Sequence, residues 1–249
     1  MKSFVVVKLM GRCGNQFYQI ATAMAYAWKS NMGFFTTSNA EPVNRLYFPQ
    51  FPQRDIGGTV YEERRNEQGN PYYAVLPHGM SNPYLIGYWQ SFKYFEEFKE
   101  RIWQEFNLPY QPNDYVSIHV RRGDYLEHSD VFPPLPLEYY QKAVELMNKK
   151  GYFKFLIFSD DIDYCKSVFV DENFDERNQF HYSENKSELE DISLMSSCKH
   201  NILANSSFGF AASFFNRNEN KIVVCPTMKN MFAGCNIDMI PESYTQIEF

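Results

Sequence analysis

The chain has 249 residues, a formal net charge of −6 and a pI near 5.4. This length allows one large domain or two small ones with a substantial core, and the acidic balance argues against a general nucleic-acid binder, which would carry a basic patch or stripe. Five widely spaced cysteines without a CxxC pair predict reduced thiols in a cytoplasmic protein, rather than a disulfide framework or a zinc site: Cys13, Cys165, Cys198, Cys225 and Cys235.

The first thirty residues predict a strand, a glycine loop and a helix. The apolar run that begins at Phe4 stops at Lys8, which is too short for a signal-peptide core or a membrane span and predicts a buried strand over residues 4–9. The following loop, which contains Gly14 and Asn15, has the layout of a phosphate cradle but is neither a P-loop nor a GxGxxG motif. Apolar residues at helical spacing then predict a helix over residues 16–30.

The middle of the chain carries weaker signals. Residues 31–83 have little periodicity and predict irregular structure with short helices or strands. A strand is expected over residues 85–89, and an amphipathic helix should follow through Tyr94, Phe98, Ile102 and Phe106. Two prolines between residues 107 and 114 mark the best candidate linker.

The second half alternates strands with helices. Strands are expected over residues 115–120, 154–158 and 201–204, and helices over 137–150, 162–169, 191–198 and 208–215. This alternation predicts an α/β fold with a parallel sheet.

Each of these three strands ends in a polar cluster, and the clusters read RRGD, SDD and NSS. Ligands of parallel sheets bind outside the carboxyl ends of the strands, so we expect the clusters to share one crevice. Arg121 and Arg122 suit a diphosphate because guanidinium groups match phosphate oxygens bidentately. Ser206 and Ser207, at a helix N-terminus, would add hydroxyl and amide donors.

The aspartates complete the expected ligand. Either Asp160 or Asp161 could accept two N–H groups of a guanine edge, so the combined site would hold a guanosine diphosphate sugar. His119 would donate to the nucleobase if it faces the crevice, and Asp124 would hold an arginine in orientation.

Each assignment has a structural alternative. One of the two aspartates is expected to cap the next helix, the serines could act only as caps, and His119 could be a packed strand histidine. The SDD triplet also resembles the carboxylate metal site of other sugar transferases, although the arginine pair would make a metal redundant.

Four segments together resemble the α-1,2-fucosyltransferases of glycosyltransferase family 11. They are MGRCGNQFYQIATAMAYA, HVRRGDY, LIFSDDIDYCK and DISLMSSCKHNILANSSFGFAASF, in the order found in the family. Two departures are GRCGNQ where GGLGNQ is common, and SSFGFAAS where a tryptophan usually follows the serine-phenylalanine run. The second departure bears on the acceptor, as does the unmatched stretch of residues 31–79.

The resemblance implies a GT-B-like fold of two Rossmann-like halves whose parallel sheets face a central cleft. Residues 1–108 would form the acceptor-side domain and residues 109–249 the GDP-sugar-binding domain, with the final helix or tail packing back on the first half. It implies transfer of L-fucose from GDP-fucose to a galactose-containing oligosaccharide, with inversion and without a metal or a cofactor. We expect no nucleic-acid partner and a peripheral association with membrane glycolipid synthesis.

The resemblance also implies residue roles. Arg121 would hold the β-phosphate, with Arg122 and Asp124 supporting the loop as the remaining catalytic residues. The implied donor contacts are Gly14, Asn15, His119, Asp160, Asp161, Ser206 and Ser207. The general base stays open among Glu127, His128, Asp130 and Glu96. A non-catalytic sugar-nucleotide or glycan-binding protein and a metal-dependent transferase that uses Asp160 and Asp161 are the alternatives.

Overall fold

A computed structural model describes residues 3–249, and the chain divides into two compact units. Unit 1 comprises the chain up to Asn107 together with Gly234–Pro241, and unit 2 comprises Leu108–Ala233 and Glu242–Phe249. The first division falls beside the proline-containing segment of residues 107–114. Within residues 3–249, no helix combines the length and apolar character needed to cross a bilayer.

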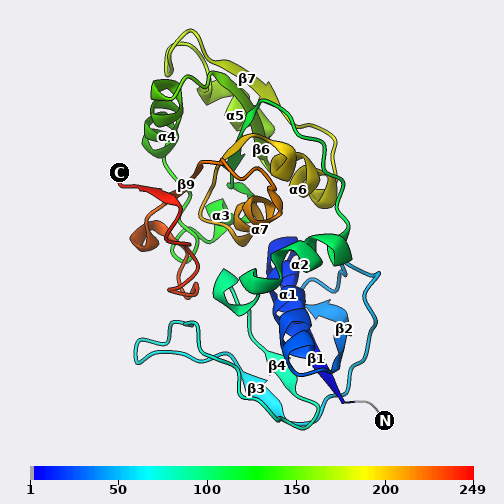
Figure 1. Cartoon of the computed structure of the whole chain (residues 1–249). Helices are drawn as coiled ribbons and strands as arrows, with labels where there is room; N and C mark the ends of the chain where they lie inside the picture. The colour runs from blue at the N-terminus through cyan, green and yellow to red at the C-terminus, as the bar shows by residue number, and fades with distance from the viewer. Residues whose placement is uncertain (1–2) are drawn as a thin grey trace. The chain divides into compact units, whose positions relative to one another are not determined.

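Unit 1 is a four-stranded parallel sheet in the order β2-β1-β4-β3. Its strands are β1 (Phe4–Met10), β2 (Gly33–Glu41), β3 (Val60–Glu62) and β4 (Tyr84–Ile86). Helix α1 (Cys13–Lys29) packs along β1, as Figure 1 shows, and most of its side chains are buried. Two 3₁₀ turns, η1 (Phe92–Tyr94) and η2 (Glu96–Phe98), precede α2 (Lys99–Phe106).

Three features of unit 1 differ from the prediction. The nine-residue strand β2 lies in a region expected to be irregular, because GFFTTSNAE has no clear alternation of apolar and polar residues. The strand expected over residues 85–89 ends at Ile86, since Trp89 has a left-handed backbone with φ 56°. The expected amphipathic helix is α-helical only from Lys99 onward.

Unit 2 is a six-stranded parallel sheet in the order β10-β9-β8-β5-β6-β7. Its strands are β5 (Val116–Val120), β6 (Lys154–Ser159), β7 (Gln179–Tyr182), β8 (His200–Ile202), β9 (Val223–Pro226) and β10 (Thr245–Ile247). Its helices are α3 (Gly123–Glu127), α4 (Leu137–Lys149), α5 (Ile162–Val168), α6 (Glu188–Ser197) and α7 (Ser207–Phe215), with a 3₁₀ turn η3 (Met228–Asn230).

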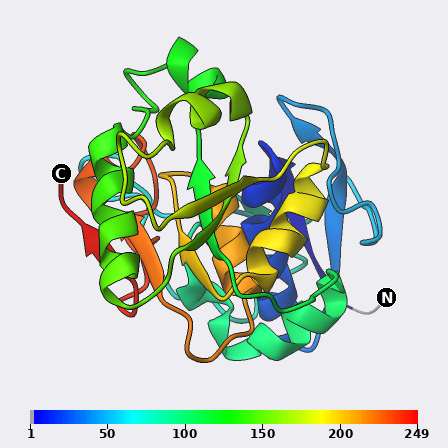
Figure 2. The ribbon, with the colours of Figure 1, turned by 90° about the horizontal axis from the view of Figure 1, so that it is seen from above.

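The two faces of the unit 2 sheet are covered by different helices. Val116, Ile118 and Val120 of β5 share one buried cluster with residues of α4 and α5. On the opposite face, the Asn201 Nδ2 donates to Ser117 Oγ and to a carbonyl of α6. Figure 2 shows α4 (green) and α6 (yellow) on opposite sides of the strands. The predicted α/β class with parallel sheets is confirmed, while a cleft between the two sheets stays a prediction.

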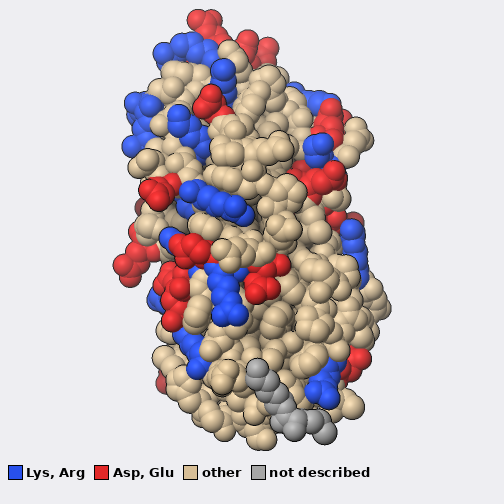
Figure 3. Space-filling view, turned by 45° about the vertical axis from the view of Figure 1, so that its right-hand side comes forward, with Lys and Arg blue, Asp and Glu red and all other residues tan. Residues whose placement is uncertain are grey.

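Charged side chains are mixed on the surface. On the face seen in Figure 3, the basic and acidic side chains of the described residues are interspersed, in keeping with the net charge of −6. A ligand anion would therefore have to be recognised by a local group of cations rather than by a broad basic surface.

Candidate functional site

The three polar clusters expected to share a crevice follow neighbouring strands. β5 lies between β8 and β6 in the sheet, and all three run parallel, with Val120 paired to Ser159 and Ile118 to Ile202. RRGD, SDD and NSS therefore emerge at the same edge of unit 2. Parallel sheets bind ligands at this edge.

Arg121 is held by two carboxylates. Its Nη1 lies 2.6 Å from Asp160 Oδ2 and its Nη2 lies 2.5 Å from Asp124 Oδ1. The Arg121 side chain is only 16% exposed, so these pairs are partly shielded from water. The role predicted for Asp124, holding an arginine in orientation, matches this contact.

Arg122 is fixed against helix α5. Its Nε lies 3.0 Å from Asp161 Oδ2, and its guanidinium carbon lies 3.4 Å from the centroid of the Tyr164 ring. Asp161 Oδ1 also accepts from the Tyr164 backbone N–H and so caps α5. One aspartate of the SDD triplet therefore caps the next helix, as the structural alternative anticipated.

Asp160 joins the two arginines. One oxygen pairs with Arg121, and the other accepts from the backbone N–H of Arg122 at 2.9 Å. Gly123 leaves the room for this, because an added Cβ would come within 2.4 Å of Asp160 Oδ2. Asp160 and Asp161 thus position the arginines, and their contact with guanine stays a prediction.

Two guanidinium groups here face three carboxylates. A guanidinium has five N–H donors, so Arg121 keeps donors for a further anion after pairing with two oxygens. The carboxylates fix both side chains before any ligand arrives. This arrangement is preorganised to receive negative charge at the carboxyl end of β5.

His119 is buried on the face of β5 that α7 covers. It is 4% exposed, and its Nδ1 has no hydrogen-bond partner within residues 3–249. An added Cβ on Gly209 would lie 3.0 Å from this nitrogen. Burial and the positive charge of Arg121 lower the pKa of His119 to about 3. The imidazole is therefore neutral near pH 7, which suits contact with a neutral base better than with phosphate.

The loop from β8 to α7 is fixed by its own hydrogen bonds. Asn205 Nδ2 donates to the carbonyls of Pro133 and Asn230, and the Asn205 carbonyl accepts from Tyr125 Oη. Ser206 Oγ caps α7 by accepting from a backbone N–H, and Ser207 is the first residue of that helix. The serines therefore lie at a helix N-terminus, and their contact with diphosphate stays a prediction.

Gly14 and Asn15 lie in unit 1, in the first turn of α1, so the predicted donor contacts are divided between the two units. Asn15 Oδ1 accepts from Gln90 Nε2 at 2.8 Å. Gly11 has a left-handed φ of 68°, and an added Cβ there would lie 2.3 Å from Asn15 Nδ2. The loop conformation thus requires this glycine.

The four candidates for the general base, Glu127, His128, Asp130 and Glu96, are all exposed. A buried carboxylate in unit 1, Glu63, was not predicted because it lies in the segment of weak pattern. Its oxygens accept from the Tyr88 backbone N–H and from Asn236 Nδ2, and burial raises its pKa. Tyr164, which stacks on Arg122, was not predicted either, because the signal for the start of this helix is the cap residue Asp161 and not the tyrosine.

The residues present do not form a metal site in the described part of the chain. Between residues 3 and 249, no three His, Cys, Asp or Glu side chains are grouped so that they could hold a metal ion. Asp160 and Asp161 instead pair with guanidinium groups. The metal independence of the reaction stays a prediction.

Comparison with known proteins identifies the family. The model of glycosyl transferase family 11 matches residues 58–235, more than half of the chain. The chain belongs to glycosyl transferase family 11. The predicted family is therefore confirmed, and the arginine pair and all of the SDD and NSS clusters lie within the matched residues.

Relatives of this family 11 chain include two proteins of Escherichia coli. The O-antigen biosynthesis glycosyltransferase WbnK is 38% identical over 129 residues, which cover 49% of this chain and 40% of WbnK. An alpha-1,2-colitosyltransferase is 26% identical over an alignment that covers 99% of both chains. The galactoside alpha-(1,2)-fucosyltransferase 1 of Alouatta caraya is 26% identical, with 82% of this chain and 63% of that protein covered.

Solved structures support the fold of this family 11 chain. The NodZ fucosyltransferase from Bradyrhizobium matches with a TM-score of 0.52 and 14% identity, covering 93% of this chain and 97% of NodZ. A crystal of NodZ α-1,6-fucosyltransferase soaked with GDP-fucose matches with a TM-score of 0.50 and 13% identity. At such identities the likeness concerns the fold alone.

Proposed function

We propose that the protein transfers L-fucose from GDP-β-L-fucose to the 2-hydroxyl of a terminal β-galactoside, with inversion and without a metal ion. The family supports glycosyl transfer, and the names of two relatives, an alpha-1,2-colitosyltransferase and a galactoside alpha-(1,2)-fucosyltransferase, support the linkage. The observation that carries the proposal is the arginine pair at the end of β5, held by three aspartates.

In this mechanism the acceptor oxygen attacks the anomeric carbon on the face opposite GDP. The new carbon–oxygen bond forms as the bond to the β-phosphate oxygen breaks, and the acceptor proton passes to a base. Negative charge grows on the departing phosphate, where Arg121 would stabilise it. A preorganised donor at a developing charge commonly contributes about two to three orders of magnitude in rate.

The remaining polar groups would bind the donor. The N-terminus of α7, with Ser206 and Ser207, would add donors to the diphosphate. Neutral His119 would lie against the base, and Gly14 and Asn15 would contribute from unit 1. The proposal includes a galactose-containing acceptor glycan and a peripheral association with membrane glycolipid synthesis.

A second donor is favoured by one comparison. The relative whose alignment spans 99% of both chains is a colitosyltransferase, so an activated colitose is the alternative sugar donor. Both donors would present a diphosphate to the same arginines. The sugar-binding contacts alone would then distinguish them.

The deciding experiment measures transfer to lactose from GDP-fucose and from the corresponding activated colitose, with and without EDTA. We expect a fucosylated product in EDTA and a configuration at the new linkage opposite to that of the donor. Activity that EDTA abolishes and manganese restores would support Asp160 and Asp161 as metal ligands instead. Binding of GDP-fucose without hydrolysis or transfer would support the non-catalytic alternative.

A second experiment compares the affinity of the protein for guanine and uracil nucleotides. Calorimetry should show tighter binding of GDP and GDP-fucose than of UDP and UDP-sugars. Equal affinity for UDP would remove guanine recognition from the proposal.

A further inference from the structure

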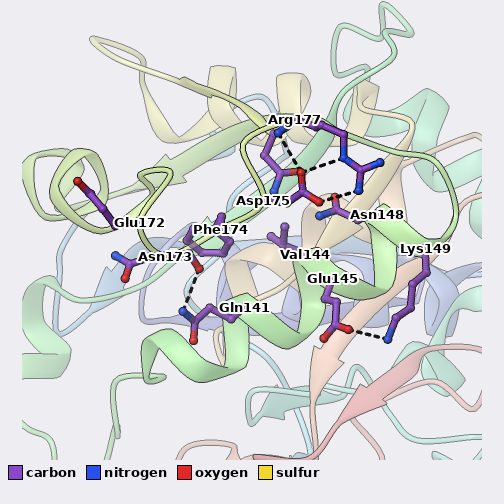
Figure 4. A pocket seen from close by; sticks show the side chains of 11 residues that line it. Gln141, Val144, Glu145, Asn148, Lys149, Glu172, Asn173, Phe174, Asp175 and Arg177 are labelled. Carbon is purple, nitrogen blue, oxygen red and sulfur yellow. Dashed lines mark hydrogen bonds and ion pairs between the residues drawn. The ribbon is translucent and has the colours of Figure 1, made fainter.

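Unit 2 contains a pocket of about 580 Å³ beside helix α4, shown in Figure 4. It is lined by α4 from Gln141 onward and by residues 172–175, 177 and 178 of the segment before β7. Asn148 lies in the last turns of α4, which precedes β6, and Asn178 directly precedes β7. The pocket thus lies toward the amino ends of these strands, whereas the arginine pair follows a carboxyl end. It is separate from the site described above.

The pocket holds amide groups that the protein leaves unpaired. Asn178 is only 8% exposed, yet neither its Oδ1 nor its Nδ2 has a hydrogen-bond partner among residues 3–249. Asn148 Oδ1 is likewise buried and unpaired within the described chain. Buried polar groups are nearly always paired, so each such exception calls for an explanation, such as a bound ligand or water.

Both cations that line the pocket are already paired with carboxylates. Lys149 Nζ lies 2.7 Å from Glu145, and Arg177 makes two contacts of 2.6 and 2.9 Å with Asp175. Figure 4 shows these two ion pairs at separate positions on the rim. With Glu172, the lining has three carboxylates and two cations. Both cations are largely exposed, at 72% for Lys149 and 65% for Arg177, whereas the Arg121 side chain is 16% exposed. Solvent screens exposed charges, so these two cations attract an anion less than the arginine pair does, and a neutral ligand fits the pocket better.

The base of the pocket is apolar. Val144 is 1% exposed and Phe174 packs on the core, where its ring stacks on Phe169 with centroids 5.1 Å apart. Figure 4 places both side chains between the polar groups of α4 and the Asp175–Arg177 pair. Unpaired amides, which both donate and accept, therefore lie close to an aromatic ring. A sugar offers the matching chemistry, since its hydroxyls donate and accept and its C–H faces are apolar.

We propose that this pocket binds a neutral saccharide, whose hydroxyls pair with the Asn178 and Asn148 amides while one carbon face packs on Phe174. The volume lies within the range of roughly 300–1,000 Å³ typical of small-molecule sites. In the free protein these unpaired amide atoms have almost no exposed surface, so a sugar would bind as the two side chains turn their amides toward its hydroxyls. Only the choice of a galactoside as the first probe rests on the proposed function.

The test is an NMR titration of the ¹⁵N-labelled full chain with lactose, N-acetyllactosamine and maltose at millimolar concentration. We expect the side-chain NH₂ signals of Asn178 and Asn148 to shift saturably with at least one of them. Asn178→Leu should weaken this binding at least tenfold, followed through the backbone amides of Asn173 and Arg177. Its melting temperature should not fall, because the substitution removes an unpaired buried amide.

Three further variants serve as controls for the titration. Asn148→Ala should also weaken binding and serves if Asn178→Leu does not fold, while Asn220→Leu, at an exposed position in unit 2, should leave binding unchanged. The titration is repeated in Arg121→Ala protein, where the pocket should still bind, so that failure of the transfer mechanism and failure of this proposal are distinguishable. Absence of a saturable shift with all three sugars, unchanged binding in both Asn variants, or a stronger response to GDP or inorganic phosphate would overturn the proposal.

Discussion

The proposed role of Arg121 in stabilising the departing phosphate can be tested by substituting this one residue. Arg121→Ala should lower kcat by about two to three orders of magnitude, because its contact with the phosphate would strengthen as charge develops. Arg121→Lys should restore little, since an ammonium group cannot reproduce a planar bidentate contact. Steady-state kinetics at saturating GDP-fucose measure both.

The control is Arg101→Ala, which removes an exposed arginine paired with Glu105 in helix α2. It should leave kcat within about twofold, because surface pairs contribute little. A near-normal kcat in folded Arg121→Ala would contradict the leaving-group role and leave the arginine a binding or structural element.

His119 should make stability depend on pH. Its pKa in the folded protein is about 3, against a usual value near 6.5, so between these values the unfolded chain binds more protons. The free energy of unfolding should therefore fall as the pH decreases from 6.5 toward 3. His119→Gln should reduce the loss between pH 7 and pH 5 by about 1–2 kcal/mol, measured by urea denaturation.

A second buried group must be allowed for in that measurement. Burial raises the pKa of Asp191 from its usual value of 3.8 to about 6 in the folded protein. Between these two pH values, the folded chain therefore binds a proton that the unfolded chain has released. The contribution of Asp191 to the free energy of unfolding is therefore present at acidic pH and is lost as the pH rises through 6. The contribution of His119 changes with pH in the opposite direction. Wild type and His119→Gln share the contribution of Asp191. An equal change in the free energy of unfolding with pH in the two proteins would therefore exclude a contribution from His119.

Residue types and spacing were enough to select the arginines, Asp124 and the SDD triplet, because a strand followed by charged residues is visible in the sequence. Which aspartate pairs with which arginine could not be predicted in the same way. That Asp160 bridges Arg121 and the Arg122 backbone depends on β5 and β6 being neighbours in register, which sequence order does not state. Glu63 carried no usable signal, since its partner Asn236 is 173 positions away.

At the scale of elements, the Asp161 side chain at the N-terminus of α5 has two functions, one for each of its oxygens. Asp161 Oδ1 caps the helix and Asp161 Oδ2 pairs with Arg122. Asp161→Asn keeps a capping oxygen but removes the charge, so its stability should stay near wild type while KM for GDP-fucose rises. Asp161→Ala should lose about 1 kcal/mol as well.

Thermal melting and donor titration of the two variants distinguish these contributions. Ser187→Ala, which removes the cap of α6 in the same unit, is the matched control, because it should cost similar stability without changing KM. Equal KM in Asp161→Asn and wild type would show that the ion pair with Arg122 is dispensable for donor binding.

Long periodic elements were predictable, whereas most short ones were not; the three-residue strands β4 and β8, expected over residues 85–89 and 201–204, are exceptions. Helix α4 was expected over residues 137–150 and spans Leu137–Lys149, because its apolar residues recur at helical spacing over three turns. The strands β7, β9 and β10 have three or four residues each, too few to show a period. The five-residue helix α3 was missed for the same reason, in the loop after the arginines.

At the scale of the whole molecule, the chain passes between its units at three points, after Asn107, Ala233 and Pro241. Segment 234–241 therefore completes unit 1 from far along the sequence. Asn236 Nδ2 donates to Glu63, and Asp238 accepts from the Tyr73 backbone N–H and pairs with Lys93. The stability of unit 1 should thus depend on residues near the C-terminus.

Asn236→Ala should test this dependence. Removing the donor leaves a buried carboxylate oxygen of Glu63 unpaired, at a cost of about 1–3 kcal/mol. Hydrogen exchange should accelerate for amides of β1 and α1 in unit 1 and stay unchanged for β5 and β6 in unit 2. The exposed Asn220→Ala is the control, and equal acceleration in both units would contradict the assignment of the segment to unit 1.

The pairing of Glu63 with Asn236 also sets an order on the ribosome. Asn236 is synthesised 173 residues after Glu63, which at about 5–20 residues per second corresponds to roughly 9–35 s of translation. During that interval, the sheet of unit 1 lacks one of the hydrogen bonds that neutralise the cost of burying Glu63. Meanwhile β5, β6, β8 and α7 of unit 2 are all translated before Asn236. Unit 1 is therefore begun first but completed only with residues 234–241, shortly before β10 completes the sheet of unit 2. A nascent chain stalled before residue 236 would present an incomplete first unit to chaperones and proteases.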